Sequence, residues 1–409
     1  MKPPRAAHRR GQAGDEVTMS AKQLRGRAKL SRRSALILAL SSLTAASAPA
    51  SSAGPALTRP LPAEPAAPRG SVILKPIAHW TDIFLQGWDY DEEYSLPLSE
   101  SPDSWDHYNV SYSVDACTAM FRATGERRYL DRALQFVENV AAAATLSSSL
   151  PNSRYRDRYH GWASSRSGEG GDEIPLYESY FWRYATALLV AMTQSRTVHD
   201  DPNYRSRYDR LLRFAEVDIF EKWYSRDPAD HIYRERTHMA AHWALIALYL
   251  SQITSDPVRR TRYLDVVDNI DLHLPGRQAG LRGQLRRHPA EPTAYFWSDV
   301  WGSARLPGQD VSHANGVIAY VAEACDRGRT WTKADMAAFS ALLTKVIWPG
   351  GSVYRSYVDG TGSDNGWFSD GFVKLGRYDP AVQRRLETHQ VVNDQFAANM
   401  ALNVRLLNS

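Results

Sequence analysis

Cysteine and long apolar runs are scarce in this sequence. Their scarcity argues against a metal-binding cysteine cluster and against a membrane anchor. There are only two cysteines in 409 residues, Cys117 and Cys325, in separate apolar stretches. Two isolated cysteines cannot supply a metal-binding cysteine cluster, and the sequence leaves open whether they form a disulfide or stay free thiols. Near the N-terminus, the apolar run at residues 35–40 is shorter than the roughly 20 residues that span a bilayer, so it does not predict a membrane anchor.

Two motifs that carry cofactors or metals are also missing. No glycine-rich phosphate-binding loop follows a strand-like segment, so nothing in the sequence indicates a nucleotide, flavin or haem site. His238 and His242 have the i, i+4 spacing of a metal-binding pair, but Met-Ala-Ala stands between them, without the glutamate of the H-E-x-x-H zinc peptidases. We therefore expect no cofactor, while the sequence leaves a bound divalent cation open.

The N-terminal segment has the three parts of an export signal. Arg32 and Arg33 directly precede the apolar run, and small residues follow up to an A-x-A-like cleavage zone at 48–53. The arginine pair resembles that of twin-arginine signals, with alanine and leucine where phenylalanine is usual. We therefore expect a secreted or periplasmic protein, divided into an export signal at 1–53, a Pro/Ala-rich leader at 54–71 and one folded domain at 72–409.

Removing this signal changes the sign of the net charge. Residues 1–53 carry ten Lys/Arg and two Asp/Glu, so the remaining residues have a formal net charge of −4, against +4 for the whole chain. The basic isoelectric point thus belongs to the signal and does not predict a nucleic-acid or membrane partner. Any anionic ligand must therefore be bound by arginines close to its binding site.

From residue 108 onward, strongly apolar helical stretches alternate with amphipathic ones. The apolar stretches cover residues 113–123, 177–195, 238–253, 311–325 and 366–375. The amphipathic stretches cover residues 128–144, 204–223, 259–272, 333–346 and 381–389, and a last stretch covers 393–407. Three amphipathic stretches follow an Asp-Pro pair, at Asp201, Asp256 and Asp379, which is a helix-start signal because proline fits the first turn and the carboxylate caps its amides.

This alternation predicts an all-α fold in two concentric layers, with the apolar helices inside. The unit of about 60 to 75 residues repeats, which favours an α/α toroid of about five to seven helical hairpins. An open helical solenoid, which would bind proteins, is the main structural alternative.

In such a barrel, the loops before the inner helices converge on one cavity. These loops and first turns are rich in histidine, tyrosine, tryptophan and arginine, although any one of these residues could serve only packing or capping. Their recurrence in successive hairpins favours a site. The candidates are Asn109, Tyr112, Trp162, Glu178, Arg236, His238, His242, Arg286, Arg287, Tyr295, Trp297, His313, Asn315 and Trp367.

The hairpin series, the aromatic loops and the segment Asp-Val-Ser-His-Ala-Asn at 310–315 resemble α/α-toroid polysaccharide lyases that act on uronate polymers such as alginate or glucuronan. The resemblance covers residues from about 80 to the end, but the contiguous Asn-His-Tyr signature of the best-known alginate lyases is absent. It implies β-elimination of an anionic polysaccharide by an exported enzyme, which we expect to be a monomer.

A lyase needs a base, an acid and a group that neutralises the uronate carboxylate. Tyr295 is the predicted base or acid, with His238 and His242 as its partners and His313 as a second proton-transfer group. The remaining candidates are predicted to bind substrate. Asn109, Asn315 and Glu178 are the predicted neutralisers, Arg236, Arg286 and Arg287 would hold carboxylates, and Trp162, Trp297 and Trp367, with Tyr112, would contact sugar rings.

Two other functions remain open. A glycoside hydrolase would need two carboxyl groups across the scissile bond, for which the candidates are Asp106, Glu173, Glu178, Asp310 and Asp370. A non-catalytic glycan-binding protein would keep the aromatic residues without matched proton donors.

Overall fold

The computed structural model describes residues 73–166, 168–276, 279–390 and 392–409. The predicted export signal and leader lie outside the described residues. All described residues belong to one compact unit, Arg69–Ser409.

The described residues are mostly helical, which confirms the all-α class. The longer helices are α2 (Ile77–Leu85), α5 (Ser104–Thr124), α6 (Arg127–Ala142), α7 (Pro175–Gln194), α9 (Pro202–Phe214), α12 (Thr237–Ile253), α13 (Pro257–Asp271), α15 (Val311–Asp326), α16 (Lys333–Ala341) and α18 (Asp394–Leu407). The shorter helices are α3 (Trp88–Tyr90), α4 (Leu96–Ser99), α8 (Arg196–His199), α10 (Lys222–Arg226), α11 (Pro228–His231), α14 (Leu281–Gln284) and α17 (Pro380–Leu386). Stretches of π-helix are η2 (Asp91–Ser95), η4 (Ala215–Glu221) and η5 (Leu342–Ile347), and 3₁₀ turns are η3 (Ser147–Ser149) and η6 (Phe372–Tyr378). Two small antiparallel hairpins pair β1 (Thr145–Leu146) with β2 (His160–Gly161), and β3 (Arg286–Arg287) with β4 (Tyr295–Phe296).

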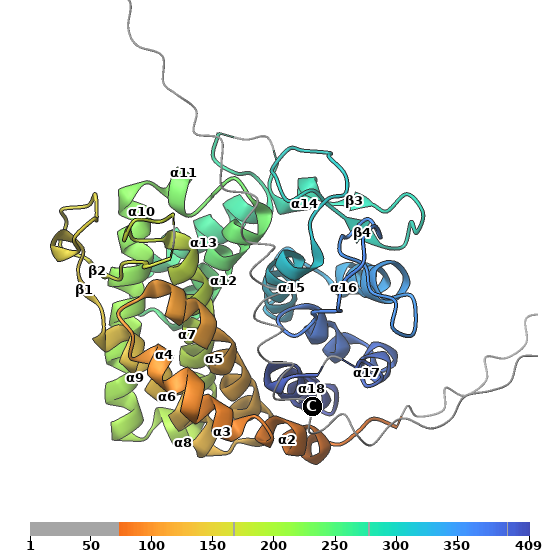
Figure 1. Cartoon of the computed structure of the whole chain (residues 1–409), viewed down its shortest axis with the longest axis horizontal. Coiled ribbons are helices and arrows are strands. Elements are labelled where there is room, and N and C mark those ends of the chain that lie inside the picture. The colour runs from red at the N-terminus through yellow and green to blue at the C-terminus, as the bar shows by residue number, and fades with distance from the viewer. Residues whose placement is uncertain (1–72, 167, 277–278, 391) are drawn as a thin grey trace, which may run out of the picture. The chain divides into compact units, whose positions relative to one another are not determined.

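The apolar stretches form helices that are buried on nearly every face. Along the chain α5 packs against α7, α7 against α12, and α12 against α15. From α15 the contacts continue to η6 and α18, and α18 packs against α5 again (Figure 1). Every residue of α12 from Thr237 to Ser251 is buried, as expected for a helix whose two sides both meet other helices.

The amphipathic stretches cover these buried helices with one apolar side. α6 packs on α5, α13 on α12, and η4 lies against α7 and α12. Next to the chain's end, α17 packs on η6 and α18, and α2 packs on α18. In α6, for example, Leu130, Leu134 and Val137 are buried, while the opposite face carries charge.

The predicted helix-start signals are confirmed. Asp201, Asp256 and Asp379 each cap a helix whose first residue is proline, and each carboxylate accepts a hydrogen bond from a backbone amide of the first turn. These caps satisfy amides that lack a partner inside the helix, and proline has no amide to satisfy.

The prediction of an inner α-helix at residues 366–375 is wrong. A loop precedes η6 instead, because Gly371 lies so close to α15 that an added Cβ would stand 2.0 Å from the Asn315 carbonyl oxygen. The Asn315 side chain fixes this loop by accepting from the Gly371 and Phe372 amides at 3.0 and 3.1 Å and donating to the Trp367 carbonyl at 2.8 Å. The second amphipathic stretch is also longer than predicted, since α9, η4 and α10 follow one another without a break from residue 202 to 226.

Both cysteines are free thiols, Cys117 buried and Cys325 half-buried. Among the described helices, none has the length and apolar character needed to cross a membrane.

Asp91 is a buried carboxyl group with incomplete hydrogen bonding. Its Oδ1 accepts from the hydroxyls of Ser95 at 3.1 Å and Ser113 at 2.6 Å, while within the described residues Oδ2 has no partner. Burial, followed by the charge of Asp394, raises the pKa of Asp91 to about 7. A neutral acid is therefore the stable form of this group in the folded protein below that pH.

We predict that Asp91→Asn removes a pH dependence of stability. Between about pH 4 and 7 the folded protein keeps a proton that the unfolded chain loses, so the free energy of unfolding should fall as pH rises, by up to about 1.4 kcal/mol per pH unit. Urea denaturation at several pH values measures this. The variant should match the parent near pH 4 and exceed it at pH 8, with the exposed Asp89→Asn as control. Parallel curves for parent and variant would contradict the assignment.

Candidate active site

Three predicted histidines meet where α12 and α15 begin. His238 and His242 lie on successive turns of α12, and His313 lies in the first turn of α15. The rings of His238 and His313 are 4.3 Å apart at an angle of 33°, and those of His238 and His242 are 6.1 Å apart. The i, i+4 spacing on one helix and the contact between two helices thus bring all three rings together.

Asp310 holds His313 in place. As the N-cap of α15, it accepts from the His313 amide at 3.0 Å, and its two carboxylate oxygens lie 2.9 and 2.8 Å from His313 Nδ1. Burial alone would raise the pKa of Asp310, but His313 and the Ser312 hydroxyl hold that pKa well below its usual value. Because a carboxylate only accepts hydrogen bonds, His313 Nδ1 carries the proton and Nε2 is the basic nitrogen of the ring.

His238 and His242 are held neutral. Burial lowers the pKa of both well below the usual value, and the nearby His313 and Arg183 respectively lower it further. In the described part of the chain, His238 Nε2 and His242 Nδ1 have no hydrogen-bond partner. Buried polar atoms without partners are costly and rare, so they favour a place that a ligand or water completes.

Aromatic and charged side chains of α5 and α7 lie beside the histidines. The Tyr180 ring is 5.1 Å from His242, and Tyr108 stacks on Tyr180 at 4.1 Å. Tyr112 lies 5.7 Å from Tyr180 and 6.0 Å from Trp367. Burial raises the pKa of Tyr112 and Tyr180, so their hydroxyls stay protonated and can donate.

Arg183 is fully buried beneath these rings. Its Nη2 pairs with Asp370 Oδ2 at 2.6 Å, and its guanidinium stands 4.1 Å from the Tyr180 ring centroid. A Cβ on Gly316 of α15 would lie 2.9 Å from His242 Nε2 and 3.4 Å from Arg183 Nη1. The absent side chain of Gly316 therefore lets α7, α12 and α15 approach closely at the site.

Tyr295, the predicted base or acid, is bound elsewhere. Its hydroxyl donates to Asp335 on α16 at 2.9 Å, and its ring lies 5.2 Å from Phe339 of the same helix. These contacts attach Tyr295 to an outer helix and not to His238 or His242, so the predicted partnership is wrong. Strand β4, which carries Tyr295, pairs with β3, and Tyr295 lies opposite Arg287 in this hairpin.

Two predicted sugar platforms belong to the core. Trp162 is 1% exposed and donates to the Val140 carbonyl at 3.0 Å, while Trp297 is fully buried. Neither ring has an open face, so their predicted role is wrong. Trp367 and Tyr112, in contrast, are only partly buried and lie next to each other beside the tyrosine cluster.

Two predicted neutralisers have structural partners instead. Glu178 is buried and accepts from Lys222 Nζ at 2.9 Å and Trp223 Nε1 at 2.8 Å. The side-chain amide of Asn315 is engaged by the loop before η6 and by its own helix, where it donates to the Val311 carbonyl at 3.0 Å. Asn109 remains on the α5 face near the tyrosines, partly buried, with its amide donating to the Trp105 carbonyl at 2.9 Å.

The predicted arginines are dispersed. Arg286 and Arg287 are exposed on β3, and Arg287 stacks over Tyr295 at 4.5 Å. Arg236, directly before α12, is paired with Asp299. Of the three, only Arg236 adjoins the histidines in sequence.

The carboxyl groups considered for a hydrolase are each engaged. Glu173, like Glu178, is buried in an ion cluster with Lys222, at 3.4 Å. Asp310 and Asp370 are bound to His313 and Arg183, and Asp106 accepts from Ser101 at 2.6 Å.

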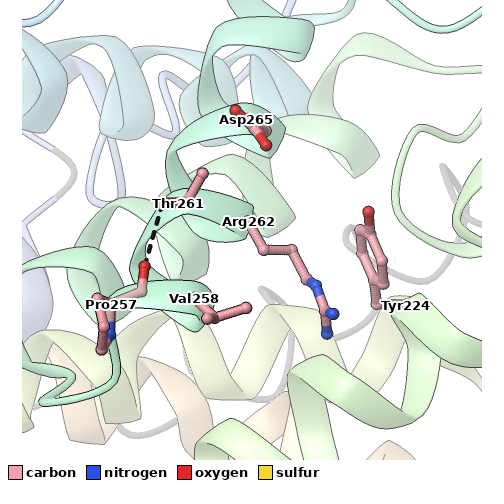
Figure 2. A pocket seen from close by; sticks show the side chains of 6 residues that line it. All are labelled: Tyr224, Pro257, Val258, Thr261, Arg262 and Asp265. Carbon is pink, nitrogen blue, oxygen red and sulfur yellow. Dashed lines mark hydrogen bonds between the residues drawn. The ribbon is translucent and has the colours of Figure 1, made fainter.

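A surface depression of about 510 Å³ is lined by six side chains of α10 and α13 (Figure 2). Tyr224 comes from the middle of α10, and Pro257, Val258, Thr261, Arg262 and Asp265 come from α13. Arg262 is paired with Glu221 and lies over the Tyr224 ring at 4.8 Å, so its charge is already neutralised by an ion pair.

Several members of the site were not predicted as such. They are Tyr108, Tyr180, Arg183, Tyr184, which shares Asp370 with Arg183, and Gln309, whose Nε2 lies 3.3 Å from His238 Nδ1. Tyr180, Arg183 and Tyr184 stand at i, i+3 and i+4 on one face of α7, and Arg183 interrupts an apolar stretch. A buried charge in an inner helix was the signal available in the sequence, because such a charge requires a partner.

We predict that Arg183→Met lowers the free energy of unfolding by about 3–5 kcal/mol, because it leaves the buried Asp370 carboxylate unpaired. Adding Asp370→Asn should recover part of this loss, as measured by chemical denaturation of both variants. The control Arg205→Met breaks an exposed pair with Asp209 and should cost less than about 1 kcal/mol. Equal losses at the two arginines would contradict the argument.

Comparison with known proteins does not assign a family or a function to the chain. No protein-family model, no curated protein and no solved structure matches the chain.

Proposed function

We propose that the folded domain, residues 72–409, is an α/α toroid whose inner helices surround the histidine site. The support is the cyclic order of packing, in which α5, α7, α12, α15, η6 and α18 each contact the next and α18 returns to α5. An open solenoid would leave its first and last helices apart. The amphipathic helices outside this cycle, including α2 beside α18, supply the second layer in six hairpins.

On this scaffold we propose an exported polysaccharide lyase that acts on a uronate polymer of the alginate or glucuronan type. The observation that carries the proposal is the adjacent pair of His313, oriented by Asp310, and His238, buried and neutral. One imidazole suits proton abstraction, while the other keeps a polar nitrogen available to substrate. The aromatic cluster beside them offers both a ring surface and protonated hydroxyls.

Elimination requires three coordinated changes in the sugar. His313 Nε2 takes the proton from C5, the C5–H electron pair forms the C4–C5 double bond, and the C4–O4 bond breaks. Tyr112 donates its hydroxyl proton to the leaving O4, in place of the originally predicted Tyr295. His238 lies beside the C6 carboxylate, where charge accumulates during proton removal.

A hydrolase is the second candidate, because one carboxyl group near the site is protonated more readily than usual. Burial, followed by the nearby charge of Asp310, raises the pKa of Asp364. A protonated Asp364 and an ionised Asp310 would form the acid and base of a hydrolase. The lyase is favoured because the Asp310 carboxylate already accepts from His313 through both oxygens.

The first test is ultraviolet absorbance during incubation of the exported form with a panel of uronate polymers. Elimination produces a conjugated double bond, so absorbance should rise with at least one polymer. His313→Asn should lower the rate by about 10²–10⁴-fold, since it removes the base. His199→Asn, at a partly exposed histidine on the short helix α8, is the matched control. New reducing ends without absorbance would establish the hydrolase, and binding without either product a glycan-binding protein.

A pair of tyrosine variants tests the revised acid. Tyr112→Phe should lower kcat by about 10²-fold or more, whereas Tyr295→Phe should keep nearly full activity because its hydroxyl serves Asp335. Circular dichroism would confirm that both variants are folded. Loss of activity in Tyr295→Phe alone would restore the original prediction.

A further inference from the structure

Gln309 is a buried loop residue fixed on both sides. It is fully buried directly before the N-cap of α15. Its amide donates to the Trp297 carbonyl at 2.9 Å, and its carbonyl accepts from the Val358 amide at 3.0 Å. The backbone therefore has little freedom, and the side chain enters the site from a defined point.

The orientation of the Gln309 side-chain amide follows from its neighbours. Trp297 Nε1 lies 3.3 Å from Oε1, and the Thr237 hydroxyl donates to the same oxygen at 2.6 Å. An indole N–H can only donate, so the atom that faces it must be the amide oxygen. The NH₂ group is consequently on the opposite side, with Nε2 3.3 Å from His238 Nδ1.

This orientation decides the tautomer of His238. An amide NH₂ group can only donate, so His238 Nδ1 must accept. In a neutral imidazole the other nitrogen then carries the proton, and here that nitrogen is Nε2. Since Nε2 is buried and has no partner among the described residues, it presents an N–H group to whatever occupies the site.

His313 has the opposite arrangement. Asp310 accepts from its Nδ1, so in the neutral ring the proton is on Nδ1 and Nε2 is the nitrogen that would act as base. Two rings whose centroids are 4.3 Å apart therefore present unlike Nε2 atoms, one a donor and one an acceptor. C5 and C6 of a uronate are bonded neighbours, and their chemistry during elimination needs such a pair.

We propose that Gln309 is a positioning residue that locks His238 as the Nε2–H tautomer, so that His238 donates a hydrogen bond to the substrate carboxylate while His313 acts as base. This role rests on the proposed lyase function. The tautomer itself follows from the hydrogen bonds of Thr237, Trp297 and Gln309 alone.

The charged and titratable groups that surround His238 support a neutral ring. They come from α12 itself, from the start of α15 and from the segment before α12, and they are His242, Asp310, His313, Arg234 and Arg236. Burial has the largest influence and lowers the pKa of His238, so the ring remains a single neutral tautomer near pH 7.

Gln309→Glu is the decisive variant. A carboxylate keeps the two acceptor contacts to Thr237 and Trp297 but has no N–H for His238 Nδ1. The ring should then place a proton on Nδ1 and point it at the carboxylate. Gln309→Met, which fills a similar volume without any donor, is the second variant and avoids a new buried charge.

Nitrogen-15 NMR of the histidine side chains measures the outcome directly, with His238→Gln used to assign the signals. The native protein should show His238 protonated at Nε2 only, and Gln309→Glu should shift the proton to Nδ1. On the best polymer, kcat should fall about 10²–10³-fold in Gln309→Glu, with KM changed much less. If the glutamate variant does not fold, loss of the single tautomer in Gln309→Met supports the proposal in its place.

The two proposals fail separately. A native His238 protonated at Nδ1, or an unchanged tautomer in both variants, would overturn the role of Gln309 whatever the activity. A native Nε2–H tautomer in a protein that eliminates none of the uronates would reject the lyase and with it the carboxylate contact. Loss of kcat together with the tautomer change supports the complete proposal.

Discussion

The structure depends on inner helices that are buried on nearly every face, because each polar side chain on them must find a partner inside the protein. Asp115 on α5 shows how this is met. It accepts from Gln395 at 2.9 Å and Asn399 at 3.1 Å on α18, and Lys374 of η6 lies 3.5 Å from it. Polar groups from distant parts of the chain therefore satisfy one another only when these three elements are in contact, which favours one arrangement over its competitors.

Because of the same constraint, buried polar atoms that lack a hydrogen-bond partner require an explanation. Where α7, α12 and α15 meet, nitrogens of Arg183, His238 and His242 are buried without partners among the described residues. Each such atom costs about 1–3 kcal/mol. Three side chains with such atoms adjoin one another here, and this grouping is what the proposed substrate contact rests on.

Helix positions could be predicted from the sequence, because apolar periodicity and the capping chemistry of Asp-Pro pairs are local properties. The segment before η6 could not, since its loop depends on contact with Asn315, more than 50 residues earlier in the chain. The histidine cluster was predicted because spacing on one helix and a position at a helix start both fix direction. Trp162 and Tyr295 were misplaced because composition does not distinguish a buried aromatic ring from an exposed one, nor reveal which distant group a hydroxyl will reach.

Asp310 has both a structural role at the start of α15 and a role in the proposed active site. Its carboxylate caps α15, which any Asp or Ser could do, and it also fixes the His313 ring, which requires a second acceptor oxygen. Thr237 also has two roles, since it begins α12 and orients the side-chain amide of Gln309. The residues that start the two helices thus also set the proton positions on two adjacent imidazoles. Since the same side chains decide both, a change that shifts either helix start would alter the protonation of the site before it altered the fold.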